Sequence, residues 1–156
     1  MAERMQTQFR KADLPPDVEA LCSTVISAAI DVHRELGPGL LEVVYERAMA
    51  MELERRTIPF KRQVEMPVSY RGSVIGEHRV ELLVGDKIVV ELKAVVELLP
   101  LHDAQTLTYL RIGQFPLGLI INFHVPLMRF GLRRILNPRW RDLVVPSIRS
   151  AADLST

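Results

Sequence analysis

The sequence predicts an α/β sandwich in which helices flank a central mixed β-sheet, and three observations support this prediction. Residues 14–36 and 40–56 carry apolar side chains at helical spacing. From residue 63 the apolar period changes to two over three consecutive segments, which is typical of strands. A further helical segment then precedes a short, almost wholly apolar run, the pattern of a strand covered on both faces. The order α-α-β-β-β-α-β, with one more strand at 130–136, indicates helices packed on a mixed sheet.

Composition places the chain in the class of single globular domains. Its 156 residues are 48% hydrophobic and 25% charged, which suffices for one proper core. The net charge of +1 neither favours nor excludes a nucleic-acid partner, so any such site must be local. The single cysteine, Cys22, excludes an internal disulfide and is expected to be a packed thiol rather than a nucleophile. We see no secretory signal and no apolar run near the roughly 20 residues of a membrane helix, and we expect a cytoplasmic protein.

The two N-terminal helices have recognisable ends. For residues 14–36 we predict Asp17 as the N-cap, and "GPG" at 37–39 ends the helix. For residues 40–56 we predict one buried stripe, formed by Leu41, Val44, Tyr45, Ala48 and Met51.

The remaining elements follow in order. Strands are predicted at 63–70, 74–84 and 88–96, a helix at 101–112, and the apolar strand at 117–123. Pro67 indicates that the first strand lies at an edge of the sheet, where it could support a homodimer. We therefore divide the chain into a flexible segment at 1–13, a folded domain at 14–136 and an irregular tail at 137–156.

The third predicted strand contains two charges in an apolar setting. In "VVELKAVVE", residues 89–97, Glu91 and Lys93 share one face of the strand with Val89. An ionised group at a central strand costs several kcal/mol unless it is paired, binds a metal or faces a wet cleft. The alternative is a partly exposed strand end where both charges pair with neighbours.

The preceding strand contains an acid, Glu81, whose position depends on the turn. A three-residue loop, Gly85–Lys87, places Glu81 opposite Glu91, whereas a two-residue turn places it opposite Val90. Two opposed carboxylates are tolerable when a cation lies between them. Oxygen ligands suit Mg²⁺ or Mn²⁺, and Lys93 could then orient a water or steady charge on a phosphate.

This arrangement resembles the PD-(D/E)XK nuclease superfamily, whose core pattern is an acid on one strand and (D/E)-x-K on the next. Here the matching residues are Glu81 and Glu91-Leu92-Lys93. "GLLEVVY", residues 39–45, also resembles the G-x-x-E-x-x-Y signature of a small family within that superfamily. The resemblance implies a restriction-endonuclease-like sandwich and a place for Glu42 in the metal site. On local grounds alone, Glu42 could equally serve the helix dipole. Tyr45 could pack in the core or support the site.

The helix after the charged strand carries a further match. Gln105 and Tyr109, with His102 one turn earlier, share a helix face, and Q-x-x-x-Y in this place resembles RecB-like nucleases. The resemblance implies that Gln105 and Tyr109 support the site or the bound strand; the alternative is a polar face with a half-buried tyrosine. One residue departs from the pattern, because Glu81 stands where the family usually has Asp. Glu is longer, which could weaken binding of Mg²⁺.

The resemblance implies a metal-dependent nuclease that hydrolyses phosphodiester bonds with a metal-activated water, with DNA favoured over RNA. The implied metal ligands are Glu81, Glu91 and Glu42, with Mg²⁺ or Mn²⁺ as the cofactor, and Lys93 is the remaining catalytic residue. The alternative is a catalytically weak or inactive nuclease fold that binds nucleic acid or assembles with partners. Nothing in the sequence speaks for or against a toxin-like or defence-associated role.

Two other groups of residues have side chains that can form functional sites. The four histidines are scattered and predict no zinc site, and a regular strand would place His78 on the face opposite Glu81. Residues 129–141 hold five arginines and Trp140, which could follow a phosphate backbone. A solvated basic surface is the favoured interpretation of that segment.

Overall fold

The structure is a computed structural model that describes residues 14–140, and it confirms the α/β prediction. Residues 1–13 and 141–156, which contain the predicted flexible segment and most of the predicted tail, lie outside the described residues. The described chain forms helices α2, α3 and α4, strands β1 to β5 and a short 3-10 helix, η2. Their bounds are α2 Pro16–Leu36, α3 Glu42–Arg55, β1 Phe60–Tyr70, β2 Ser73–Val84, β3 Ile88–Lys93, α4 Pro100–Gly113, β4 Leu117–Asn122, η2 Met128–Phe130 and β5 Leu132–Leu136.

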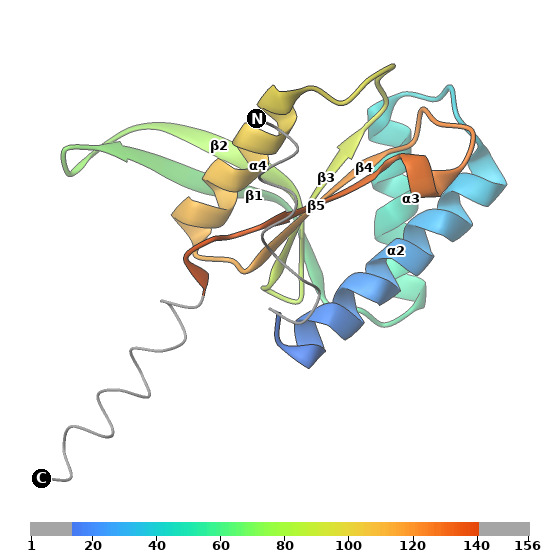
Figure 1. Ribbon diagram of the computed structural model, residues 1–156, viewed down its shortest axis with the longest axis horizontal. Helices are drawn as coiled ribbons and strands as arrows, with labels where there is room; N and C mark the ends of the chain where they lie inside the picture. Colours follow the sequence, from blue (N-terminus) through green and yellow to red (C-terminus); the bar gives the residue numbers. More distant parts are fainter. Residues whose placement is uncertain (1–13, 141–156) are drawn as a thin grey trace, which may run out of the picture.

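The five strands form one mixed sheet whose spatial order follows the sequence, β1-β2-β3-β4-β5 (Figure 1). Only β3 and β4 are parallel, and α4 provides the crossover between them. The β1–β2, β2–β3 and β4–β5 pairs are antiparallel. Strand β1, which contains Pro67, lies at the edge of the sheet as predicted.

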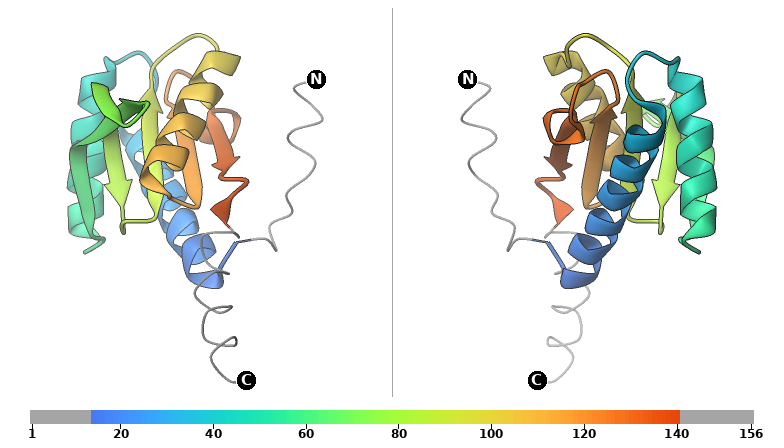
Figure 2. Two further views of the ribbon diagram at one scale, coloured as in Figure 1. Left: turned by 90° about the vertical axis from the view of Figure 1, so that its left-hand side faces the viewer. Right: turned by 90° about the vertical axis from the view of Figure 1, so that its right-hand side faces the viewer.

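The sheet is covered on both faces, which gives the molecule three layers (Figure 2). The larger core joins α2 and α3 to one face of the sheet, and Cys22 is buried in it between Val18 and Val25. The smaller core joins α4 to the other face through Tyr109, Leu110 and their strand neighbours. Strand β4 is buried along its whole length, which agrees with its apolar sequence.

Helix α4 lies very close to β4 because Gly118 has no side chain. A Cβ atom built on Gly118 would lie 2.4 Å from the Cγ2 atom of Thr106, which is well inside contact distance. The glycine therefore sets the separation of the helix from the sheet.

Two details of the helices differ from the predictions. The N-cap of α2 is Pro15, and Asp17 lies inside the first turn, where its carboxylate binds Lys87 instead. The predicted stripe on α3 was wrong for three of its five members, because Leu41, Val44 and Met51 are exposed. The buried face of α3 is formed by Tyr45, Glu46, Met49, Ala50 and Leu53. Glu46 is a carboxylate on this buried face, so the positions of the apolar residues alone did not identify the face correctly.

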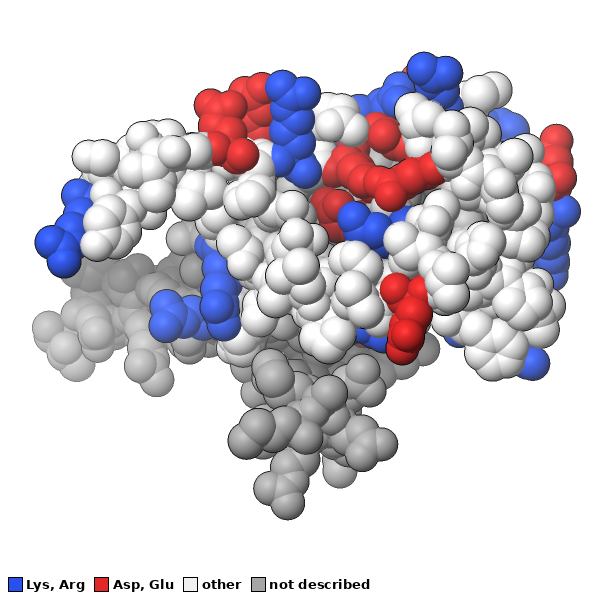
Figure 3. Space-filling view, turned by 90° about the horizontal axis from the view of Figure 1, so that it is seen from above, with Lys and Arg blue, Asp and Glu red and all other residues white. Residues whose placement is uncertain are grey.

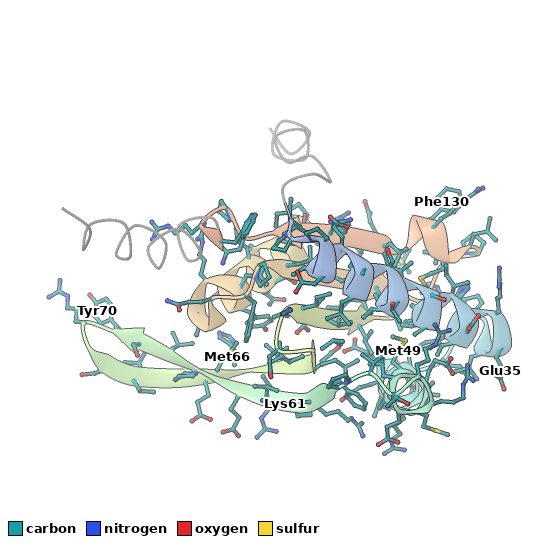
Figure 4. The ribbon with its side chains drawn as sticks, turned by 90° about the horizontal axis from the view of Figure 1, so that it is seen from below. Glu35, Met49, Lys61, Met66, Tyr70 and Phe130 are labelled. Atoms are coloured by element: carbon teal, nitrogen blue, oxygen red, sulfur yellow. The ribbon has the colours of Figure 1, made fainter. Side chains whose placement is uncertain are left out.

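Strands β1 and β2 extend beyond the body of the molecule as a two-stranded ribbon (Figure 1). In Figure 4, Lys61 lies at the base of this ribbon, Met66 lies midway and Tyr70 lies at its far end. Met66 is buried against the smaller core, whereas Tyr70, Val74 and Ile75 are exposed. The ribbon is therefore integrated into the core from its base as far as Met66, and its far end is not.

Candidate active site

The loop between β2 and β3 has the three-residue form on which the sequence interpretation depended. Val84 pairs with Ile88, which leaves Gly85, Asp86 and Lys87 as the loop. The pairing continues through Leu83↔Val89 and stops at Leu82↔Val90. Because the register is antiparallel, the next residues are Glu81 and Glu91, which face each other at the point where the two strands separate.

The two carboxylates continue the hydrogen bonding where the strand pairing stops. An oxygen of Glu81 accepts a hydrogen bond from the backbone N–H of Leu92 at 2.6 Å. In the reciprocal direction, Oε1 of Glu91 accepts the N–H of Glu81 at 3.4 Å. Each side chain thereby takes the place of a backbone carbonyl, so both carboxyl groups are fixed between β2 and β3.

Glu42 joins this pair from the first residue of α3. Its carboxyl group is hydrogen-bonded to that of Glu81. Burial, this hydrogen bond and the nearby charge of Glu91 together raise the pKa of Glu81 from 4.5 to about 10. In its protonated form Glu81 can donate this hydrogen bond to Glu42. In Figure 3, acidic side chains gather around basic ones in a hollow of the molecular surface.

Glu91 is the most buried of the three carboxyl groups and lies beside Lys93. Its side chain is 6% exposed, and burial raises its pKa from 4.5 to about 7. The positive charge of Lys93 acts in the opposite direction, while the charges of Glu42 and Glu46 raise the pKa further. Lys93 itself forms no ion pair within 4.0 Å among the residues that the structure describes, and its side chain is half-buried.

A fourth carboxylate, Glu46, was missed by the sequence interpretation. It lies one helical turn after Glu42 on α3 and is 8% exposed. Oε1 of Glu46 accepts hydrogen bonds from Nε2 of Gln63 at 2.9 Å and from Arg62 at 3.5 Å. The i, i+4 spacing from Glu42 was the available signal, because residues at this spacing share a helix face.

The Q-x-x-x-Y helix contributes one of its two residues to the cluster. Tyr109 is 9% exposed, and burial together with the charges of Glu91 and Glu81 raises its pKa. Gln105, by contrast, is exposed. His102 accepts the backbone N–H of Leu99 at 3.0 Å and so serves the start of α4. His78, which a regular strand would place on the face opposite Glu81, packs edge-on against the ring of Tyr109 at a centroid distance of 5.6 Å.

Tyr45 supports the entry into α3. Its hydroxyl donates to the carbonyl of Gly37 at 2.6 Å and accepts the N–H of Leu40 at 3.2 Å. Its ring stacks on Phe123 with a centroid distance of 4.3 Å. Tyr45 thus holds the loop that leads directly to Glu42, and it is fully buried rather than open to a substrate.

The ligand chemistry of the cluster fits a small divalent cation. Glu42, Glu81 and Glu91 offer carboxylate oxygens, the donors that Mg²⁺ and Mn²⁺ prefer. Within residues 14–140, however, no three acidic, histidine or cysteine side chains already stand as a metal-binding group. The carboxyl group of Glu81 is instead hydrogen-bonded to that of Glu42 and to the N–H of Leu92, and the carboxyl group of Glu91 accepts the N–H of Glu81.

The arginine-rich segment near the C-terminus has two of its arginines in ion pairs. Arg133 binds both carboxylate oxygens of Asp103, and Arg134 binds both of Glu19. Trp140 packs against the larger core, and Arg141 lies outside the described residues. Two of the five arginines are therefore tied within the domain, which argues against a continuous phosphate-binding track.

Comparison with known proteins agrees with the geometry. No curated protein and no solved structure gave a significant match. Across the helices that the structure describes, none is long and apolar enough to cross a membrane. The family model of the PD-(D/E)XK nuclease superfamily matches residues 19–135, a span that contains α3, the β2–β3 pair and α4. With its mixed sheet flanked by helices and this match over most of its length, the chain belongs to the PD-(D/E)XK nuclease superfamily.

Proposed function

We propose that this protein is a metal-dependent nuclease that hydrolyses phosphodiester bonds, with DNA as the favoured substrate. The observation that carries the proposal is the convergence of Glu42, Glu81 and Glu91 beside Lys93, in a chain that belongs to a nuclease superfamily. We further propose that it belongs to the G-x-x-E-x-x-Y group with a RecB-like Q-x-x-x-Y helix. Gly39, Glu42 and Tyr45 support the first assignment, and Gln105 and Tyr109 support the second.

In this proposal the acidic residues bind the cation, and the other residues act on water and substrate. Glu81, Glu91 and Glu42 would hold Mg²⁺ or Mn²⁺, which supplies Lewis-acid stabilisation of charge on a phosphate. Lys93 would orient the attacking water and stabilise negative charge on the phosphoryl oxygens. Tyr109 would support Glu91 and Glu81. Water attack forms one P–O bond as the bond to the leaving oxygen breaks, which leaves a phosphomonoester and a hydroxyl.

The proposal is tested by cleavage of single- and double-stranded DNA and RNA with Mg²⁺ or Mn²⁺. We expect Lys93→Ala and Glu91→Ala each to reduce the rate by at least about 10²-fold, because each removes a group that acts on the reacting centre. Lys87→Ala is the matched control, because Lys87 lies before the first residue of β3, at the opposite end from Lys93, and binds Asp17 of α2. Metal-dependent cleavage that survives both site substitutions would refute the assignment of these residues.

A second candidate function is a nuclease fold that binds nucleic acid or partners with little or no turnover. Two observations favour it: Glu81 replaces the usual Asp, and its carboxyl group is occupied by Glu42 and the N–H of Leu92. Calorimetric titration with Mn²⁺ separates the two candidates. Weak or absent binding that Glu91→Ala leaves unchanged would favour the binding module, and binding that Glu91→Ala abolishes would favour the nuclease.

A further inference from the structure

We propose that Gln63 is a positioning residue of the candidate active site. Its backbone bend interrupts the pairing of β1 with β2 at Glu81, and this interruption releases the Glu81 carboxylate toward Leu92. The inference deepens the proposed function, on which it rests for what the positioned carboxylate would do.

The first observation is a break in the sheet at Gln63. Pairing of β1 with β2 runs through Arg62↔Leu82 and resumes at Val64↔Val80, and the pair between them, Gln63 with Glu81, is missing. Gln63 has a φ of 51°, in the left-handed region that residues with a side chain seldom adopt in a strand. The bend therefore lies directly across from Glu81.

The second observation is the effect of this break on β2. Residues two apart on a regular strand share a face. Val80, however, packs in the smaller core with Tyr109, whereas Leu82 packs in the larger core with α2 and α3. The strand thus turns about its own axis at Glu81. In a regular strand this side chain would stand out from the sheet instead of accepting the N–H of Leu92 on the neighbouring strand.

The third observation is a tether from the bend to helix α3. Nε2 of Gln63 donates to Oε1 of Glu46 at 2.9 Å, and Glu46 is buried one turn after Glu42. Gln63 therefore interrupts the pairing of β1 with β2 at Glu81 and also binds the helix that carries Glu42. Gln63 therefore helps to position two carboxyl groups that are distant in the sequence, Glu81 through its backbone bend and Glu42 through its side chain.

The experiment measures hydrogen exchange of the Leu92 amide in the full chain by NMR, relative to the core amides of Leu83 and Val90. Gln63→Val disfavours the left-handed bend because its side chain is β-branched. We expect the Leu92 amide to exchange at least roughly tenfold faster in this variant, relative to the core amides. Gln63→Gly accepts the bend and is expected to keep Leu92 within about threefold of wild type. The core amides show whether a variant has simply lost stability.

A control variant places the same substitution at a similar bend elsewhere. Arg71 has a φ of 48° at the far end of the ribbon, and Arg71→Val should leave Leu92 unchanged. Unchanged relative exchange of Leu92 in Gln63→Val would overturn the proposal, as would equal losses in the Val and Gly variants. The exchange measurement does not depend on catalysis. An inactive wild-type protein would therefore refute the nuclease function, and the exchange rates of Leu92 would still test the positioning role of Gln63. If the wild type is active, Gln63→Val should lower kcat about tenfold with little change in KM.

Discussion

The side-chain amide of Asn122 binds both backbone polar groups of Val95. Its Oδ1 accepts the N–H of Val95 at 3.1 Å, and its Nδ2 donates to the carbonyl of Val95 at 2.9 Å. Asn122 is 3% exposed at the end of β4, where it is in register with Lys93. The amide therefore acts as one further strand residue and fixes the chain just after the lysine of the candidate active site.

This relationship predicts that Asn122→Ala impairs both stability and activity. The substitution removes the partner of three backbone groups, the N–H and the carbonyl of Val95 and the N–H of His124. We expect it to lower the free energy of unfolding by about 2–3 kcal/mol in urea titrations. Asn137→Ala is the matched control, because the buried amide of Asn137 binds the carbonyls of Leu110 and Phe115 away from Lys93. Only Asn122→Ala should also slow cleavage; equal effects of both variants on cleavage would contradict a link to Lys93.

The buried carboxyl of Glu91 predicts a pH-dependent stability. Its pKa in the folded protein, about 7, exceeds the ordinary value of 4.5, so the folded state binds this proton more tightly. The resulting stabilisation is complete below about pH 4.5 and is lost as the pH rises through 7. We expect the free energy of unfolding to fall by about 3 kcal/mol between pH 4.5 and 8 from this residue alone. Urea titrations of Glu91→Gln should lack that component; an identical pH slope in variant and wild type would contradict the prediction.

The close approach of α4 to β4 predicts a coupled pair of substitutions. Gly118→Ala should cost about 1–3 kcal/mol because its new Cβ would overlap Cγ2 of Thr106. Thr106→Ser removes that methyl group and retains the hydroxyl that donates to the carbonyl of His102. In a double-mutant cycle, Thr106→Ser should therefore recover part of the stability lost in Gly118→Ala. Strictly additive losses would show that the overlap is relieved elsewhere.

The hydroxyl of Tyr45 predicts a local effect on the loop before α3. Tyr45→Phe keeps the stacking on Phe123 but removes the partner of Gly37 and Leu40. We expect a loss of about 1–2 kcal/mol in the free energy of unfolding, measured by urea titration. Tyr70→Phe at the exposed end of the ribbon is the control and should change it by less than about 0.5 kcal/mol. A loss no larger than that of the control would refute the role given to the hydroxyl.

Those features that rest on periodicity and turn length could be predicted from the sequence. The alternation of apolar residues gave the strands, and the opposition of Glu81 and Glu91 followed on the condition of a three-residue loop, which the structure has. The apolar run at β4 and the proline on β1 gave a buried strand and an edge strand. These signals depend only on residues near one another in the sequence, so they can be interpreted without the tertiary structure.

The rest depends on tertiary contacts that leave little trace in the sequence. Glu46 interrupts the apolar pattern of α3 because its carboxyl group is buried against Gln63, so the predicted stripe contained Tyr45 correctly but also contained exposed residues. The left-handed backbone at Gln63 has no residue signature, since glutamine is ordinary in strands. The expectation for His78 holds only for a regular β2, and the strand instead turns about its axis at Glu81.

The ribbon of β1 and β2 has a consequence for how the molecule yields to force or heat. Between Ser69 and Arg79 its residues are exposed, so separating the two strands there uncovers little apolar surface. The far end of the ribbon can therefore fray while the helices remain packed on both faces of the sheet. We expect cooperative unfolding to involve the ribbon only from Met66 and Val80, where it packs against the smaller core.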